Sequence, residues 1–281
     1  MKPLRLILVF IIYSNLFIAG CAVAMVDQTY RFLLHSQMNI NFLLFVFFST
    51  LCSYSFHWYL TSHSVIPSPR IKWLEKNRNI HLVLFIIGLA GAGFFFFYLL
   101  PYWFWLLIGV IITFLYSAPK LPHRHFKMLR KVALGKTIFL AFVWMYVTTI
   151  LPVIISEREW NTSYVLFAVS RFFQIYAICI LFDWRDREDD KAEGIRSLIT
   201  YLDEKGNFYL FTFSLIIFGI CTGLLYRYDY KISDIIILLI PGILTAVLYQ
   251  YAKRNFLDIF YYFILDGLIA FSALIMLISS I

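Results

Sequence analysis

The stretch Asp183-Trp-Arg-Asp186-Arg-Glu-Asp-Asp190-Lys-Ala-Glu-Gly194-Ile-Arg196-Ser-Leu lies between two apolar segments, residues 165–182 and 208–225. Eight of the nine residues 183–191 are charged, although charge is costly in lipid. On a helix, the spacing i, i+3, i+7 places Asp183, Asp186 and Asp190 within an arc of about 60°. Such carboxylates repel one another unless a cation lies between them, and Mg²⁺ commonly bridges one or two carboxylates to substrate phosphates. The stretch therefore predicts a Mg²⁺ site, and the alternative is a solvated loop that separates two membrane spans.

The rest of the chain is strongly apolar. Hydrophobic residues make up 62% of 281 and charged residues 14%, with a mean hydropathy of +0.80, whereas soluble domains have about 45–50% apolar and about 25% charged residues. Because a membrane crossing takes about 20 apolar residues, we predict one all-α membrane domain, residues 1–281. Its nine spans lie near residues 5–25, 39–57, 80–98, 102–118, 136–155, 164–182, 208–225, 233–251 and 257–279.

Lys and Arg predict the orientation of these spans. With the amino terminus inside, nineteen of the 24 basic residues fall in inside segments, as the positive-inside rule expects. The acidic stretch then lies on the cytoplasmic face of a membrane that we take to be a bacterial inner membrane. The net charge of +8 is mainly a topology signal that also attracts anionic lipid, and it does not indicate nucleic-acid binding.

Several polar and sulfur-containing residues fall inside the predicted spans. The four cysteines have no metal-ligand spacing, so we predict that they are packing residues. Cys21 also fits a lipidation signal, but the apolar run continues past it, and we keep the segment as a span. Arg171 and Asp266 lie near the middle of their spans and either pair with each other or serve a substrate. Residues 196–206 predict a short amphipathic helix that ends at Gly206.

Two segments together resemble the UbiA-type membrane prenyltransferase superfamily. The first, Asp183-x-x-Asp186-x-x-x-Asp190-x-x-x-Gly194-x-Arg196-Ser-Leu, is similar to the second aspartate motif of that superfamily. The second, Leu115-Tyr-Ser-Ala-Pro-Lys120, is similar to its tyrosine-serine-x-proline stretch before the fifth span. The predicted nine-helix topology, with its site in the cytoplasmic loops, also matches.

The resemblance implies transfer of a prenyl group from an isoprenyl diphosphate to a lipophilic acceptor, which is often aromatic. It implies that Asp183, Asp186 and Asp190 hold Mg²⁺, which neutralises the departing diphosphate. Four basic residues lie where cations that bind the diphosphate are expected: Lys120, Arg124, Lys127 and Arg196. Arg can bind phosphate through two parallel hydrogen bonds, and Lys offers a point charge. Topology alone also explains basic residues in these loops.

The chain departs from the superfamily at the end of the second span. The first acidic motif should fall near residues 53–63, yet no Asp or Glu occurs between Asp27 and Glu75. His57 and His63 are candidates for direct diphosphate contact or are interfacial residues. This departure keeps a second hypothesis open, a relative that binds a prenyl diphosphate or a quinone-like lipid without turnover. A third hypothesis is a transporter with Arg171 and Asp266 on its path.

Overall fold

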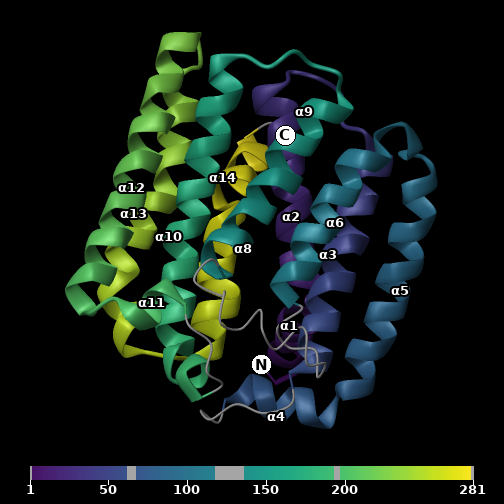
Figure 1. Cartoon of the computed structure of the whole chain (residues 1–281), viewed down its shortest axis with the longest axis vertical. Coiled ribbons are helices and arrows are strands. Elements are labelled where there is room, and N and C mark those ends of the chain that lie inside the picture. Colours follow the sequence, from purple (N-terminus) through teal and green to yellow (C-terminus); the bar gives the residue numbers. More distant parts are fainter. Residues whose placement is uncertain (1, 62–67, 118–135, 193–196, 280–281) are drawn as a thin grey trace.

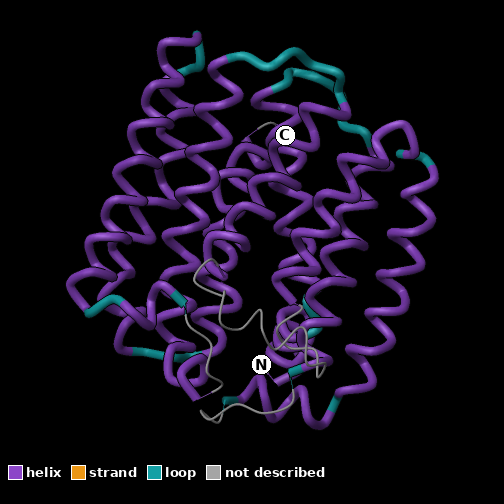
Figure 2. The backbone as a smooth tube through the Cα atoms, in the orientation of Figure 1, coloured by secondary structure: helices purple, strands orange, loops and turns teal. Residues whose placement is uncertain are grey.

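The computed structural model describes residues 2–61, 68–117, 136–192 and 197–279. All regular elements in those ranges are helical, which confirms the predicted all-α class (Figure 2). In the list, α marks an α-helix and η a 3₁₀- or π-helical turn. The elements are α1 (Lys2–Tyr13), α2 (Leu16–Gln28), η1 (Thr29–Leu33), α3 (Ile40–Leu60), α4 (Pro69–Lys76), α5 (Arg78–Phe97), η2 (Leu100–Tyr102), α6 (Trp103–Ser117), α8 (Lys136–Met145), η5 (Tyr146–Ile150), α9 (Leu151–Ile155), α10 (Thr162–Ala192), α11 (Leu198–Tyr201), α12 (Glu204–Leu224), η6 (Leu225–Tyr228), α13 (Ile232–Arg254), η7 (Phe260–Leu265) and α14 (Asp266–Ser279).

The described helices account for the predicted membrane spans with two differences. Eight of them are long and apolar enough to cross a membrane: Leu16–Leu33, Ile40–Leu60, Arg78–Phe97, Thr137–Ile155, Thr162–Ala192, Glu204–Tyr228, Ile232–Arg254 and Phe260–Ile278. The predicted span 102–118 corresponds to α6, which has 15 residues. At about 1.5 Å per residue, α6 is shorter than the hydrocarbon layer of about 30 Å. The two chain termini lie toward opposite ends of the bundle (Figure 1).

The predicted first span, residues 5–25, is wrong in its bounds because the helix breaks at Asn15. This residue has a left-handed backbone, with a φ of 67°, a conformation that Asn tolerates better than most residues. The crossing helix is α2 together with η1. The preceding helix, α1, is separate, with Leu4 and Leu6 strongly exposed.

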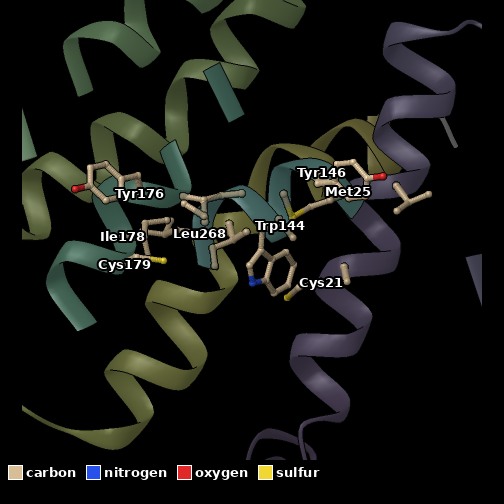
Figure 3. Close-up of a cluster of buried hydrophobic side chains, with 14 of the residues drawn as sticks. Cys21, Met25, Trp144, Tyr146, Tyr176, Ile178, Cys179 and Leu268 are labelled. Carbon is tan, nitrogen blue, oxygen red and sulfur yellow. The ribbon is translucent and has the colours of Figure 1, made fainter. Parts of the chain in front are cut away.

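Helix α10 organises the bundle and packs against α8, α12, α13 and α14. Buried side chains from α2, α8 and α10 meet at its inner face, among them Met25, Trp144 and Ile178 (Figure 3). On the other side of the bundle, α5 lies directly against α3. A Cβ at Gly88 would come within 2.6 Å of the Cys52 backbone nitrogen, so only glycine permits this close approach.

The acidic stretch is helical, because α10 continues from Thr162 to Ala192 over 31 residues. At about 1.5 Å per residue this length is about 46 Å, well beyond the hydrocarbon thickness of about 30 Å. The last turns of α10 therefore extend past the apolar layer, where carboxylates can meet water-soluble groups. This result supports the predicted stripe geometry and rules out a simple loop at residues 183–191.

The amphipathic helix predicted at residues 196–206 is shorter and ends differently. Helix α11 covers only Leu198–Tyr201, and α12 begins at Glu204. Gly206 lies in the first turn of α12, where its N–H donates to Asp203 Oδ1 at 2.7 Å. The Asp203 cap starts a new helix at the position where the glycine was expected to end one.

Candidate functional site

A cavity of about 760 Å³ lies within the bundle, between α2, α3, α5, α6, α8 and α10, with the segment 256–269. Most of its wall is apolar. Six carboxylates and two guanidinium groups of the described residues also line it: Asp183, Asp186, Asp189, Asp190, Asp258, Asp266, Arg70 and Arg185. A cavity with convergent polar groups in an apolar wall is the usual form of a small-molecule site.

All three predicted metal-binding aspartates face this cavity. Asp183 and Asp190 are 6% and 4% exposed, and Asp186 is half-buried. The Thr137 hydroxyl donates to Asp183, and Arg185 Nε donates to Asp186 Oδ1 at 2.7 Å. We call Asp183, Asp186 and Asp190 the aspartate stripe.

The aspartate stripe offers carboxylate oxygens, which are the ligands that Mg²⁺ prefers. Among the described residues, no three His, Cys, Asp or Glu side chains already form a closed metal cage. Mg²⁺ seldom uses such a cage, because it keeps several waters and takes one or two carboxylates together with substrate phosphates. Oxygen donors at the wall of an accessible cavity fit that mode of binding.

The predicted diphosphate-binding residues Lys120, Arg124, Lys127 and Arg196 lie outside the described residues. Sequence reasoning missed two other cations, Arg70 and Arg185, which line the cavity. Arg185 lies within the acidic motif, where the sequence does not distinguish it from the neighbouring charged residues. Nothing in the sequence distinguishes Arg70 from the other basic residues of its loop.

Arg70 lies at the start of α4 and is 4% exposed. Its guanidinium is 3.9 Å from the Trp58 ring and 3.8 Å from the Tyr262 ring, and its Nη2 donates to Asn15 Oδ1 at 2.8 Å. Burial lowers the pKa of the guanidinium, whose ordinary value is so high that the group stays charged. The left-handed Asn15 that breaks the first helix therefore also holds Arg70 in place.

Arg185 contacts the same tyrosine, with its guanidinium carbon 4.6 Å from the Tyr262 ring centre. It donates to the Tyr262 hydroxyl through Nη2 and to Asp186 through Nε. Two arginines thus flank one aromatic side chain at the cavity wall. Such stacked cations are well placed to bind a planar or tetrahedral anion.

The ion pair between Arg171 and Asp266, one of the two predicted alternatives, does not form in the described part of the chain. Arg171 instead donates to five neutral oxygens, at 2.7–3.1 Å: Met25 O, Gln28 Oε1, Thr29 Oγ1, Thr148 O and Thr149 Oγ1. Thr148 O is available because Pro152, four residues later in the helix, has no N–H to donate to it. Arg171 therefore joins α2, η5 and α10 and has a structural role, while Asp266 lines the cavity.

Replacing Arg171 with Met should destabilise the bundle without touching the cavity. The change leaves several buried oxygens without donors, at about 1–3 kcal/mol each, so we expect a loss of about 3 kcal/mol or more and a clearly lower midpoint of thermal unfolding in detergent. Arg171→Lys keeps the charge but has three donors instead of five, and should recover only part of the loss. An unchanged midpoint for Arg171→Met would contradict this structural role.

The region that contains the aspartate stripe also identifies the family of the chain. The model of the UbiA prenyltransferase family matches residues 60–233, more than half of the chain. The matched range includes the aspartate stripe and residues 115–120, and it begins after Ser53 and His57. No curated protein and no solved structure matches the chain. The predicted family is thereby confirmed, and this integral membrane protein belongs to the UbiA prenyltransferase family.

Proposed function

We propose that this protein transfers a prenyl group from an isoprenyl diphosphate to a lipophilic acceptor within the membrane. The observation that supports it best is one cavity in which carboxylates and arginines lie beside an otherwise apolar wall. An isoprenyl diphosphate likewise combines a charged part and an apolar part, its anionic head group and its hydrocarbon chain. Family membership supports the same class of reaction.

In this proposal, the aspartate stripe holds Mg²⁺ against the diphosphate. Bound Mg²⁺ would neutralise charge that develops on the departing diphosphate as the carbon–oxygen bond ionises. Asp183 and Asp190 are fixed by burial in α10, and Asp183 is oriented by Thr137. These residues orient the head group, and the apolar wall limits access of water to the allylic carbon.

Aromatic side chains of the cavity wall are suited to an allylic cation. Tyr54 and Trp144 line the cavity, and aromatic faces attract cations. Trp144 is held by a hydrogen bond of its indole N–H to the Tyr54 hydroxyl, at 3.2 Å. Because this bond fixes the orientation of the Trp144 ring, the ring can stabilise the allylic cation and so slow its reaction with water.

The isoprenoid chain has a separate place in this proposal, between α5 and α6. Their cavity-lining residues follow helical spacing, at Phe85, Leu89, Ala92, Gly93 and Phe96 on α5 and at Leu106, Gly109, Val110, Thr113 and Phe114 on α6. We call these ten residues the apolar groove. From Phe85 to Phe96, eleven steps of about 1.5 Å give a length of about 17 Å. Leu89 and Val110 are 55% and 54% exposed, so apolar surface in this groove is accessible to an isoprenoid chain.

The test is a turnover assay on the purified protein in detergent, with labelled prenyl diphosphates of several chain lengths and a set of aromatic acceptors. We expect Mg²⁺-dependent release of diphosphate and a prenylated product. Diphosphate release without product would point to the wrong acceptors. Absence of both release and binding at millimolar Mg²⁺ would refute the proposal.

A second candidate is a relative that binds the diphosphate without turnover. It is favoured by the end of α3, where Ser53, His57 and Thr61 line the cavity and no carboxylate does. Binding of a prenyl diphosphate together with no release of diphosphate under any condition would select this candidate. The transporter hypothesis keeps only one of its two residues, because Arg171 has a structural role while Asp266 lines the cavity.

We further propose that the polar end of the cavity faces the cytoplasm of a bacterial cell, as the positive-inside rule predicts. Reporter fusions should then place Gly135 and Asn207 inside and Ile281 outside. Asn207 lies near the start of α12, at the same end of the bundle as the amino terminus (Figure 1). A reporter at Ile281 that is active only in the cytoplasm would contradict this orientation.

A further inference from the structure

Helix α3 contributes no negative charge to the cavity wall among the residues that the structure describes. Ser53, His57 and Thr61 line it at spacing i, i+4, i+8, and α3 contains no Asp, Glu, Lys or Arg from Ile40 to Leu60. The side chains at this spacing share one face of the helix. This part of the site offers hydroxyl groups and an imidazole, which are poor replacements for carboxylates as Mg²⁺ ligands.

A buried cation lies next to this face. Arg70 stacks on Trp58 of the same helix, and its Nη2 is bound by the neutral Asn15. Its Nε has no acceptor, and in the described part of the chain its guanidinium forms no ion pair. The carboxylate of Asp258 accepts instead from the Arg70 backbone N–H at 2.7 Å.

Arg185 adds a second cation on the same aromatic ring. Among the described residues, it contacts one carboxylate, that of Asp186, and its Nη1 has no acceptor. A buried guanidinium group with unused donors is unfavourable unless an anion accepts hydrogen bonds from it. The two arginines can therefore donate hydrogen bonds to an anionic ligand that enters the cavity.

We propose that Arg70, assisted by Arg185, binds the diphosphate directly and replaces the metal that a first acidic motif would hold. This role rests on the proposed function. A guanidinium can form two parallel hydrogen bonds with phosphate oxygens and carries its positive charge permanently. The site then combines one carboxylate-held Mg²⁺ with two arginines, and part of its affinity for diphosphate does not require metal.

The test measures binding of geranyl thiolodiphosphate, an analogue that ionises poorly, by calorimetry in detergent. The wild-type protein should bind the analogue in EDTA and more tightly at millimolar Mg²⁺. Arg70→Gln should lose about tenfold or more of the affinity in EDTA, which corresponds to about 1.4 kcal/mol. Arg187→Gln is the matched control, since Arg187 lies on Trp184, pairs with Glu188 and is not part of the cavity wall; it should bind within twofold of the wild type.

A second variant tests the replacement itself. Adding His57→Asp to Arg70→Gln returns a carboxylate to α3, so affinity should recover at millimolar Mg²⁺ and stay low in EDTA. If Arg70→Gln does not fold, as judged by thermal unfolding, Arg70→Lys takes its place, because it keeps the charge and loses the paired hydrogen bonds. Wild-type affinity of the Arg70 variant in EDTA would overturn this inference alone. A wild-type protein that binds the analogue in neither condition would refute the proposed function instead.

Discussion

Replacing Asp190 with Asn is expected to abolish the Mg²⁺-dependent part of diphosphate binding and to reduce turnover by several orders of magnitude. The residue is 4% exposed and lines the cavity. Asn keeps the size of the side chain and removes the negative charge on which Mg²⁺ binding depends. The measurement is the affinity for geranyl thiolodiphosphate as a function of Mg²⁺ concentration, together with diphosphate release. Asp183→Asn should behave in the same way, with some loss of stability because Thr137 donates to Asp183.

Glu188 provides the matched control for these variants. It lies on the same helix, pairs with Lys191 at 3.1 Å and is not part of the cavity wall. Glu188→Gln removes one negative charge from the same segment and should leave Mg²⁺ dependence unchanged. Equal losses for Glu188→Gln and Asp190→Asn would show general electrostatics and would contradict a metal site at the aspartate stripe.

Replacing Gly93 with Trp is expected to convert the protein into one that accepts only short donors. Gly93 lies in the apolar groove, and a Cβ there would meet no atom within 4 Å, so the indole can fill the groove without displacing the backbone. Filling a hydrophobic site of this kind changes specificity by about tenfold or more. We expect kcat/KM for long prenyl diphosphates to fall by that factor while geranyl diphosphate is nearly unaffected.

The control for this variant is Gly219→Trp. Gly219 is also helical and has no atom within 4 Å of its Cβ position, but it lies on α12, which does not line the cavity. Both variants add the same indole to a membrane-spanning helix. A fall of kcat/KM in both variants would therefore reflect impaired membrane insertion or folding. A Gly93→Trp protein that still uses long donors as the wild type does would place the isoprenoid chain elsewhere in the cavity.

Several features could be predicted from the sequence because they depend on local patterns. Apolar segments of about 20 residues identify membrane helices, since each unpaired backbone group in lipid is costly. The spacing of Asp183, Asp186 and Asp190 places them on one helical face wherever the helix continues, and α10 does continue through them. The motif around them, together with residues 115–120 and the predicted topology, predicted the family.

Boundaries were harder to predict, because they depend on single residues and distant partners. The break at Asn15 interrupts a continuous apolar run, and its left-handed backbone is stabilised by hydrogen bonds to Arg70 and Ser55. Gly206 was expected to end a helix, but the Asp203 cap starts one there. Arg70 and Ser55 lie 55 and 40 residues from Asn15, so the local pattern does not reveal them, whereas Asp203 lies three residues before Gly206 and is a local helix-start signal.

The sequence by itself determined the all-α membrane class, the helical stripe of carboxylates and the absence of acidic residues near the end of the second span. Only the tertiary structure decided that Arg70 and Arg185 flank Tyr262 at the cavity wall, that Asp266 faces the cavity, and that Arg171 binds neutral oxygens. The physical reason is the distance along the chain: Arg70 and Tyr262 belong to helices near opposite ends of the sequence, and contacts between such residues are set by how the helices pack and not by local periodicity.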